Sequence, residues 1–222
     1  MFYEPGITSH GLAKPPFKSC VVPRPIGWIS TISADGIPNL APYSQFTNLS
    51  FDPPFILVSI NEGRRFKRKD TTINIEETGE FVYNMATYDL RDKVNITAGE
   101  FAPEVDEFER AGLTKAPSEI VKPFRVAESP IQFECKYHQT IHLAGDGKKG
   151  SADLIIGRVV GIHIKDEFIL PDGKLDILGM KPLARLGYMD YTTIDRIFEI
   201  KPFLDDGLEA DVPFGLQGGA SE

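Results

Sequence analysis

The chain has 222 residues, of which 41% are hydrophobic and 25% are charged, a composition typical of a folded domain with its own core. Its 24 lysines and arginines stand against 32 aspartates and glutamates, which gives a net charge of −8. A negative field of this size repels nucleic-acid phosphates and anionic lipid, so we expect neither a nucleic-acid nor a membrane partner.

The cysteines and the hydropathy pattern bear on the compartment in which the protein is expected. Cys20 and Cys135 are too few for a disulfide framework and lack the spacing of a metal motif. The first residues lack the basic and apolar regions of a secretory signal peptide. The longest apolar runs, such as residues 55–60, fall far short of the roughly 20 residues that span a bilayer. We therefore expect a cytoplasmic protein.

The N-terminal third of the chain predicts an arm and then β-strands. Residues 1–20 contain proline, glycine and lysine with little periodicity, which is typical of an arm. Residues 26–33 are rich in β-formers and lead into Asp35-Gly36, a strong hairpin signal, so the return strand is predicted at 39–47. The prolines of Asp52-Pro53-Pro54 cannot donate to a ladder and end that pairing.

Short strands and helices are predicted in the middle of the chain. Residues 55–60 and 80–86 are apolar β-runs. Between them, residues 69–79 predict a helix, with Asp70 as N-cap and Gly79 at the C-terminal end. Two further helices are predicted at residues 89–98 and 104–111, the latter with Pro103 at its start and Gly112 just past its end.

The clearest β pattern lies in the C-terminal half. Residues 131–143 alternate between mainly apolar and polar side chains, as expected of a half-buried antiparallel strand. Its partner is predicted at residues 154–164, across a loop at 145–151. One more strand is predicted at 192–200, and the Gly- and acid-rich residues after Pro202 indicate a loose tail.

These elements predict a mostly β protein. The strands form two blocks around a helical insert at 69–112, without the β-α-β alternation of a parallel sheet. This order favours an antiparallel β-barrel with peripheral helices. We expect one domain over residues 1–203, including the arm at 1–20, and a flexible tail at 204–222.

One glycine motif imitates a dinucleotide-binding fingerprint. Residues 145–150 fit the pattern G-x-G-x-x-G and follow a predicted strand. A true fingerprint must open a helix, whose N-terminus binds the pyrophosphate. Here the next residues, 154–160, are β-branched and strand-like, so the motif is interpreted as a hairpin loop. Ser151 stands where a Walker loop needs lysine, which excludes that reading too.

Three polar residues on one face of the predicted strand 131–143 are a weaker candidate site. Glu134, His138 and His142 follow one another at intervals of four. Four strand residues span about 13 Å, so one metal ion cannot bind neighbouring members. We interpret them mainly as surface or hydrogen-bonded groups, and we keep His142, beside the loop, as a candidate substrate contact.

A local cluster of positive charge opposes the overall acidity. Residues 64–69 read Arg-Arg-Phe-Lys-Arg-Lys and lead into Asp70-Thr71 at the predicted helix start. One interpretation is a solvated charged loop. The other is an anion site, because a helix start offers free N–H groups and the favourable end of the helix dipole.

Neither the nucleophile motif G-x-S-x-G nor the zinc motif H-E-x-x-H occurs in the chain, so nothing supports hydrolase chemistry.

Taken in order, the segments resemble the flavin reductase-like family of FMN-binding split barrels, over roughly residues 18–200. The matching segments are residues 24–31, 39–46, 52–54, 69–71, 74–75, 78–82, 106–114 and 129–135. The resemblance implies a six-stranded Greek-key split barrel that is homodimeric and holds FMN near the subunit interface. The insert at 64–68 is longer and more basic than in short members of the family.

The resemblance also implies site residues for FMN. Ser30 and Thr31, with Lys69, Asp70 and Thr71, would bind the phosphate. Ser44, Gln45 and Phe46 match the segment that meets the isoalloxazine edge. Arg24 and Ser59 are further candidate contacts.

The function implied by the resemblance is an NAD(P)H-dependent flavin oxidoreductase. NADH or NADPH would give a hydride to FMN, and the electrons would pass to oxygen, a monooxygenase component or another acceptor; no catalytic acid or base is needed. One alternative is a flavoredoxin-like FMN electron carrier without nicotinamide turnover, which exchanges electrons with a protein partner. Another is a β-barrel binding module without flavin, in which the basic loop only aids solubility.

Overall fold

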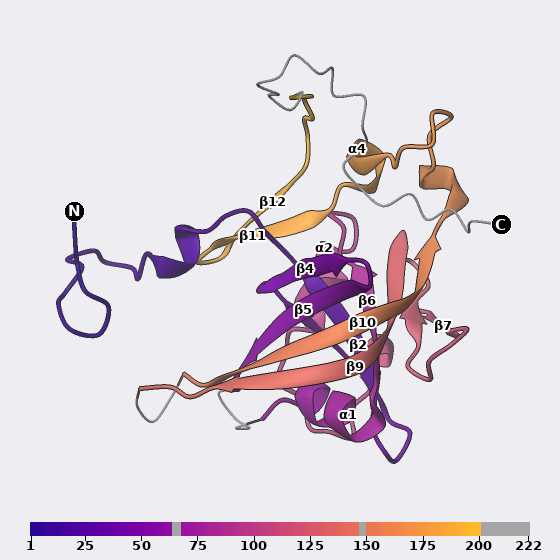
Figure 1. Ribbon diagram of the computed structural model, residues 1–222, viewed down its shortest axis with the longest axis horizontal. Helices are drawn as coiled ribbons and strands as arrows, with labels where there is room; N and C mark the ends of the chain where they lie inside the picture. Colours follow the sequence, from indigo (N-terminus) through magenta and orange to yellow (C-terminus); the bar gives the residue numbers. More distant parts are fainter. Residues whose placement is uncertain (64–67, 147–149, 201–222) are drawn as a thin grey trace.

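The computed structural model describes residues 1–63, 68–146 and 150–200, and its centre is one antiparallel sheet. The seven strands of this sheet follow the order β3-β2-β6-β9-β10-β5-β4. Figure 1 shows them wrapped around one another, with α1 below and a long N-terminal arm extending to one side. The strands are β2 (Gly27–Ile32), β3 (Pro38–Tyr43), β4 (Phe46–Phe51), β5 (Pro54–Asn61), β6 (Glu80–Met85), β9 (Ile131–Leu143) and β10 (Ala152–Ile164).

The expected count of six strands is therefore wrong for this sheet, and the reason lies in the segment after the first hairpin. The predicted return strand at 39–47 combines the end of β3 and the start of β4. A bend at Ser44 and Gln45 separates these two strands, so β3 pairs with β2 whereas β4 pairs with β5. Asp52-Pro53 has a cis peptide bond in the turn between β4 and β5.

The predicted β9–β10 hairpin is confirmed, with β9 at the predicted residues and β10 starting two residues earlier than expected. Leu143 pairs with Ala152 across the loop that carries the glycine motif. A helix does not follow this loop, which confirms its interpretation as a hairpin loop. Residues 147–149 of the motif lie outside the described residues.

The three predicted helices form, but their starts differ. Helix α1 spans Asp70–Thr78, and Asp70 is its first residue rather than its N-cap, because Lys69 still has an extended backbone. Gly79 ends α1 in the left-handed conformation, with φ of 73°, as predicted. Helix α2 is Arg91–Ile96. Helix α3 is only Glu107–Arg110, because the carboxylate of Asp106 accepts the N–H groups of Phe108 and Glu109 and caps the helix there.

A second small sheet lies beside the main one, in the order β1-β11-β12. Only the first part of the predicted strand 192–200 is confirmed, since β12 ends at Thr193. Its neighbour β11 was not predicted, because its five residues include arginine and glycine and do not alternate. The remaining elements are β1 (Arg24–Pro25), β7 (Lys115–Ala116), β8 (Arg125–Val126), β11 (Leu183–Gly187), β12 (Asp190–Thr193), α4 (Ile177–Met180) and the 3-10 turns η1 (Phe17–Ser19) and η2 (Asp166–Phe168).

Two hydrophobic cores hold these elements together. One contains Trp28, Leu40 and Phe108 and joins the β2–β3 hairpin to α2 and α3. The other contains Phe81, Cys135 and Ile155 and fills the space between the main strands and α1. Within the part of the chain that the structure describes, none of the helices is long and apolar enough to cross a membrane. The tail predicted at 204–222 lies outside that part.

Candidate functional site

A cavity lies where the arm, β1, the β3–β4 bend, β5 and the start of α1 meet. Its volume is about 740 Å³, which lies in the range of roughly 300–1,000 Å³ typical of small-molecule and cofactor sites. Six of the predicted site residues line it, namely Arg24, Ser44, Gln45, Phe46, Ser59 and Lys69. We call this the flavin cavity below, after the cofactor that the resemblance implies.

The bend between β3 and β4 forms one wall of the flavin cavity. The backbone N–H of Ser59 donates to the carbonyl of Gln45 at 2.8 Å, and the side-chain amide of Asn61 donates to Gln45 Oε1 at 2.7 Å. These two bonds fix the bend to β5. Phe46, the next residue, stacks on Tyr83 with ring centroids 4.6 Å apart, so its ring links the cavity wall to the core.

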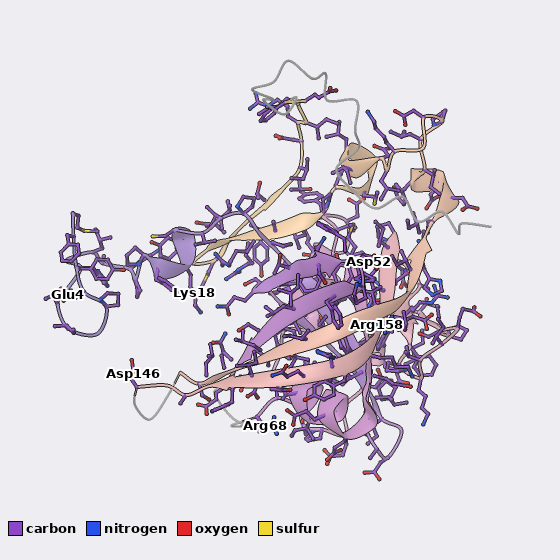
Figure 2. The ribbon with its side chains drawn as sticks, viewed as in Figure 1. Glu4, Lys18, Asp52, Arg68, Asp146 and Arg158 are labelled. Atoms are coloured by element: carbon purple, nitrogen blue, oxygen red, sulfur yellow. The ribbon has the colours of Figure 1, made fainter. Side chains whose placement is uncertain are left out.

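The arm closes the opposite side of the flavin cavity. Phe17, Lys18 and Val21 contribute to its wall. The Arg24 guanidinium donates to the carbonyls of Val21, at 3.0 Å, and Lys18, and so holds the end of the arm against β1. Figure 2 shows Lys18 near the body of the protein and Glu4 at the far end of the arm.

Lys69 connects the flavin cavity to two smaller cavities at the start of α1, because it lines all three. Its ammonium group lies 2.7 Å from a carboxylate oxygen of Glu100. The second cavity, of about 110 Å³, is lined by Asp70, Thr71, Tyr43 and Glu107 among others. Its hydroxyl groups are already paired, since Tyr43 donates to Thr71 Oγ1 at 2.8 Å and Thr71 donates to Asn39 Oδ1 at 2.9 Å.

Carboxyl groups surround this second cavity, and their environment disfavours negative charge. Burial raises the pKa of Asp70 against the opposing effect of Lys69. Burial also raises the pKa of Glu107, although the carboxylate accepts bonds from the N–H of Leu40 and the amide of Asn39, each at 3.0 Å. Burial raises the pKa of the Tyr43 hydroxyl as well.

The third cavity contains a residue that the sequence did not suggest. This cavity, of about 50 Å³, is lined by Thr72, Arg68, Lys69 and His142 among others. Thr72 is fully buried, and its hydroxyl oxygen has no hydrogen-bond partner among residues 1–63, 68–146 and 150–200. A buried polar group without a partner is costly, so an unpaired hydroxyl beside a cavity indicates a position for a ligand atom. Its place one residue beyond the matched Lys-Asp-Thr motif was the only signal that could have identified it.

His142 lines this third cavity and takes part in a chain of polar contacts. Its Nδ1 is 2.8 Å from Asp153, which it faces across the β9–β10 ladder. Asp153 is 3.4 Å from Arg68, and Arg68 Nη2 also donates to both carboxylate oxygens of Glu76 at 2.8 and 2.9 Å. Residues 64–67 of the basic cluster lie outside the described residues.

Ser30 and Thr31 lie apart from these three cavities, in the interior. Both are fully buried. The Ser30 hydroxyl donates to the carbonyl of Phe124 at 2.5 Å. The Thr31 hydroxyl accepts from the Asn74 amide at 3.0 Å and donates to Asn39 at 3.3 Å. Their polar groups therefore join β2 to α1 and to the segment before β8.

The other members of the polar face on β9 are also separate from the flavin cavity. Glu134 is buried and accepts from His163, whereas His138 packs against the ring of Phe55. No cluster of three or more metal-binding side chains occurs within residues 1–63, 68–146 and 150–200.

Comparison with known proteins shows the family of this chain. The model of the flavin reductase-like domain matches residues 19–177, and the chain belongs to that family. An uncharacterized protein from Aquifex aeolicus is 39% identical over 167 residues, which cover 75% of this chain and 82% of that protein.

Solved structures share the fold. Nitrilotriacetate monooxygenase component B from Bacillus cereus is 31% identical with a TM-score of 0.82, and the match covers 90% of this chain and 98% of that chain. The 2-nitrobenzoate 2-nitroreductase of Pseudomonas fluorescens is 26% identical with a TM-score of 0.72, covering 91% and 92%. A flavoredoxin from Desulfovibrio vulgaris has the same fold at 22% identity and a TM-score of 0.71, covering 90% and 98%.

Proposed function

We propose that this protein is an NAD(P)H-dependent flavin oxidoreductase that binds FMN in the flavin cavity. The observation that carries the proposal is the arrangement at the start of α1. There the flavin cavity shares Asn61, Glu62 and Lys69 with the small cavity beside the unpaired Thr72 hydroxyl. A large groove for a ring system thus continues into a polar recess for an anionic group.

The residues present fit FMN. Thr72 offers a hydroxyl donor, Arg68 and Lys69 offer positive charge, and the first N–H groups of a helix have no acceptor within the helix. These groups would hold the phosphate, together with Asp70 and Thr71 through their backbone. Ser30 and Thr31 would act indirectly, by fixing the strand on which α1 packs.

The bend and its neighbours would hold the ring system. Ser44, Gln45 and Ser59 supply polar groups on that wall, and Phe46 gives it an apolar surface. Bound FMN would supply the redox chemistry by accepting a hydride from the nicotinamide. The protein has to orient the rings, exclude water and donate hydrogen bonds where negative charge develops, for which the residues around the bend are placed.

The cations at the helix start are already paired with carboxylates. Lys69 is paired with Glu100, and Arg68 is paired with Glu76 and Asp153. An incoming phosphate has to compete with these carboxylates, so affinity for FMN depends on hydrogen-bond donors as well as on charge. His142 acts on the same recess through Asp153, which makes it a positioning residue in this proposal.

We also propose that the protein is a homodimer that passes electrons to oxygen, a monooxygenase component or another acceptor. Phe17 and Val21 border the flavin cavity and are 70% and 68% exposed, although both are apolar. Such side chains are favoured at subunit contacts. A second copy that covers them would also narrow the mouth of the cavity.

The test is spectroscopic. The purified protein is mixed with FMN, and the flavin spectrum of the bound fraction is recorded before and after NADH or NADPH is added without oxygen. The proposal predicts a stoichiometric complex whose visible absorbance bleaches with one of the two donors. A complex that bleaches only with a reduced protein donor would indicate the electron carrier instead. Absence of a complex would overturn the FMN site itself.

A further inference from the structure

A cavity at the other end of the β9–β10 hairpin has no role in the flavin site. It lies between the β7–β8 pair and the end of β10, has a volume of about 390 Å³, and shares no residue with the three cavities around α1. Its wall contains Arg125, Gln132, His163 and Lys165 and no carboxylate. This composition is unusual in a chain with a net charge of −8.

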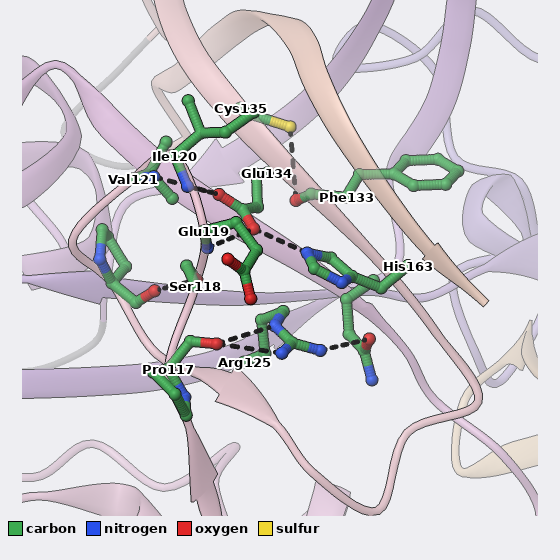
Figure 3. A network of polar contacts seen from close by, with 12 residues as sticks. Pro117, Ser118, Glu119, Ile120, Val121, Arg125, Phe133, Glu134, Cys135 and His163 are labelled. Atoms are coloured by element: carbon green, nitrogen blue, oxygen red, sulfur yellow. Dashed lines mark hydrogen bonds and ion pairs between the residues drawn. The ribbon is translucent and has the colours of Figure 1, made fainter. Parts of the chain in front are cut away.

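Strand pairing brings these four side chains together. Gln132 on β9 lies opposite His163 on β10. The Arg125 guanidinium donates to Gln132 Oε1 at 3.3 Å, which places its charge beside the same pair. Lys165 follows His163 by two residues, and residues two apart at a strand lie on one side of it. Figure 3 shows Arg125 and His163 in this arrangement, below Glu134.

The two permanently charged groups, Arg125 and Lys165, donate hydrogen bonds to uncharged acceptors. Arg125 donates to the carbonyl of Pro117, at 2.9 and 3.1 Å, and to the Gln132 amide. The Lys165 ammonium donates to the carbonyl of Glu128 at 3.1 Å. Among the residues that the structure describes, neither cation has a carboxylate within 4.0 Å. Two like charges at one cavity repel each other, and an anion between them removes that cost.

The carboxylate that contacts His163 is engaged by backbone groups. Glu134 is fully buried, and its two oxygens accept the N–H groups of residues 119, 120 and 121 at 2.8, 2.6 and 3.0 Å. His163 Nε2 donates to the same carboxylate at 2.6 Å, which fixes the imidazole in the cavity wall. The carboxylate of Glu128 accepts the N–H of Thr114. The exposed Glu119 side chain is not part of the wall.

We propose that this cavity is a binding site for a small carboxylate or phosphate anion, held by Arg125 and Lys165 beside the fixed His163. Arg125 suits such a ligand because a guanidinium presents several donors in one plane to a carboxylate or phosphate. Lys165, directly after the end of β10, adds a second charge. The site is independent of the flavin cavity and stands whether or not FMN binds there.

The experiment is isothermal titration calorimetry of the full chain with inorganic phosphate and, separately, with succinate. Wild type is compared with Arg125→Gln and Lys165→Gln, and with Lys174→Gln as a matched control. Lys174 is an exposed lysine in the loop after β10, so this substitution removes the same charge away from the cavity. Titrations are run with and without FMN, because phosphate also has chemistry suited to the recess at α1.

We expect one saturable site that is weakened at least about tenfold by Arg125→Gln and by Lys165→Gln, weakened by added salt, and unchanged by Lys174→Gln or by FMN. The anion that binds more tightly identifies the source, a phosphate ester or a carboxylic acid. Absence of saturable binding of either anion overturns the proposal, as does equal weakening by Lys174→Gln. If Arg125→Gln does not fold, because Arg125 also holds Pro117, the Lys165→Gln result decides. Loss of FMN binding alone contradicts only the flavin proposal.

Discussion

Within the described part of the chain, the buried hydroxyl of Thr72 at the start of α1 has no hydrogen-bond partner, whereas its neighbour Thr71 is bonded to Tyr43 and Asn39. The two threonines therefore differ in role: the Thr71 hydroxyl joins parts of the protein to one another, whereas the Thr72 hydroxyl is available to a ligand. A hydroxyl without an internal partner contributes nothing to stability that a methyl group of the same size would not.

Thr72→Val is therefore expected to weaken FMN binding about tenfold without lowering the free energy of unfolding. Binding is measured by titration of the flavin absorbance, and stability by urea unfolding. Thr78→Val at the other end of α1 is the control, because its hydroxyl bonds the carbonyl of Asn74 and lines none of these cavities. Equal FMN affinity in wild type and Thr72→Val would contradict the phosphate assignment.

The carboxyl group of Glu134 makes a contribution to stability that depends on pH. Burial would raise the pKa of Glu134, but the bonds from the N–H groups of Glu119, Ile120 and Val121 and from His163 lower it to about 2. A carboxyl group with a lowered pKa in the folded state stabilises the protein above its unfolded pKa and loses that effect as the pH falls.

Glu134→Gln is expected to lower the free energy of unfolding at neutral pH by about 3 kcal/mol. Both carboxylate oxygens of Glu134 accept hydrogen bonds from donors, so the NH₂ group of a glutamine side chain would face a donor whichever oxygen it replaced. The difference from wild type should shrink as the pH falls from about 4.5 to about 2. Urea unfolding across this range measures it. Glu119→Gln, at an exposed side chain, is the control, and a deficit that stays constant with pH would refute the assignment.

At the scale of elements, the close approach of β2 and β4 shapes the flavin cavity. A Cβ atom added to Gly27 would lie 2.6 Å from Cδ2 of Phe46, closer than two carbon atoms that are not bonded to each other can approach. Gly27 is therefore the residue on β2 that lets the Phe46 ring stack on Tyr83 and turn the bend toward the cavity.

Gly27→Ala is expected to lower the free energy of unfolding by about 1–3 kcal/mol and also to weaken FMN binding, because Phe46 has to move. Gly161→Ala on β10 is the comparison. There an added Cβ meets the end of the Ile120 side chain at 3.3 Å, and Ile120 is half exposed and free to shift. Thermal unfolding and flavin titration of both variants test this, and an unaltered FMN affinity in Gly27→Ala would show that Phe46 does not shape the site.

At the scale of the whole molecule, the arm and the β11–β12 turn expose apolar side chains side by side. The arm packs on β11, where an added Cβ at Gly187 would touch Ser19, and the Lys14 ammonium lies 5.3 Å from the centre of the Tyr188 ring. Met189, next to Tyr188, is 90% exposed. A large exposed apolar surface of this kind is typical of a subunit interface.

We therefore expect wild type to sediment as a dimer and Met189→Glu to shift the equilibrium toward the monomer in analytical ultracentrifugation. Ile120→Glu places the same charge on an exposed isoleucine away from the arm and should leave the dimer intact. A wild-type protein that stays monomeric at high concentration would contradict the proposed dimer.

The sequence by itself determined the elements whose signals are local. The alternation of residues 131–143, the glycine that ends α1 and the Asp-Gly turn of the first hairpin each depend on neighbours in the chain, so they could be predicted. The ordered motifs likewise determined the family, because they depend on residue identity in a fixed order and not on folded geometry.

Tertiary structure decided what depends on contacts between distant segments. The seventh strand follows from the pairing of β4 with β5, and the short α3 follows from the capping bond of Asp106. The same holds for polar groups. Ser30, Thr31, Thr71 and Thr72 are all hydroxyl residues in or beside the matched motifs. The first three are paired in the interior, whereas Thr72 lines a cavity and its hydroxyl has no partner among the residues that the structure describes. The net charge of −8 does not indicate the two local sets of cations, at the start of α1 and beside β8. Strand pairing and helix packing, rather than composition, bring such charges together.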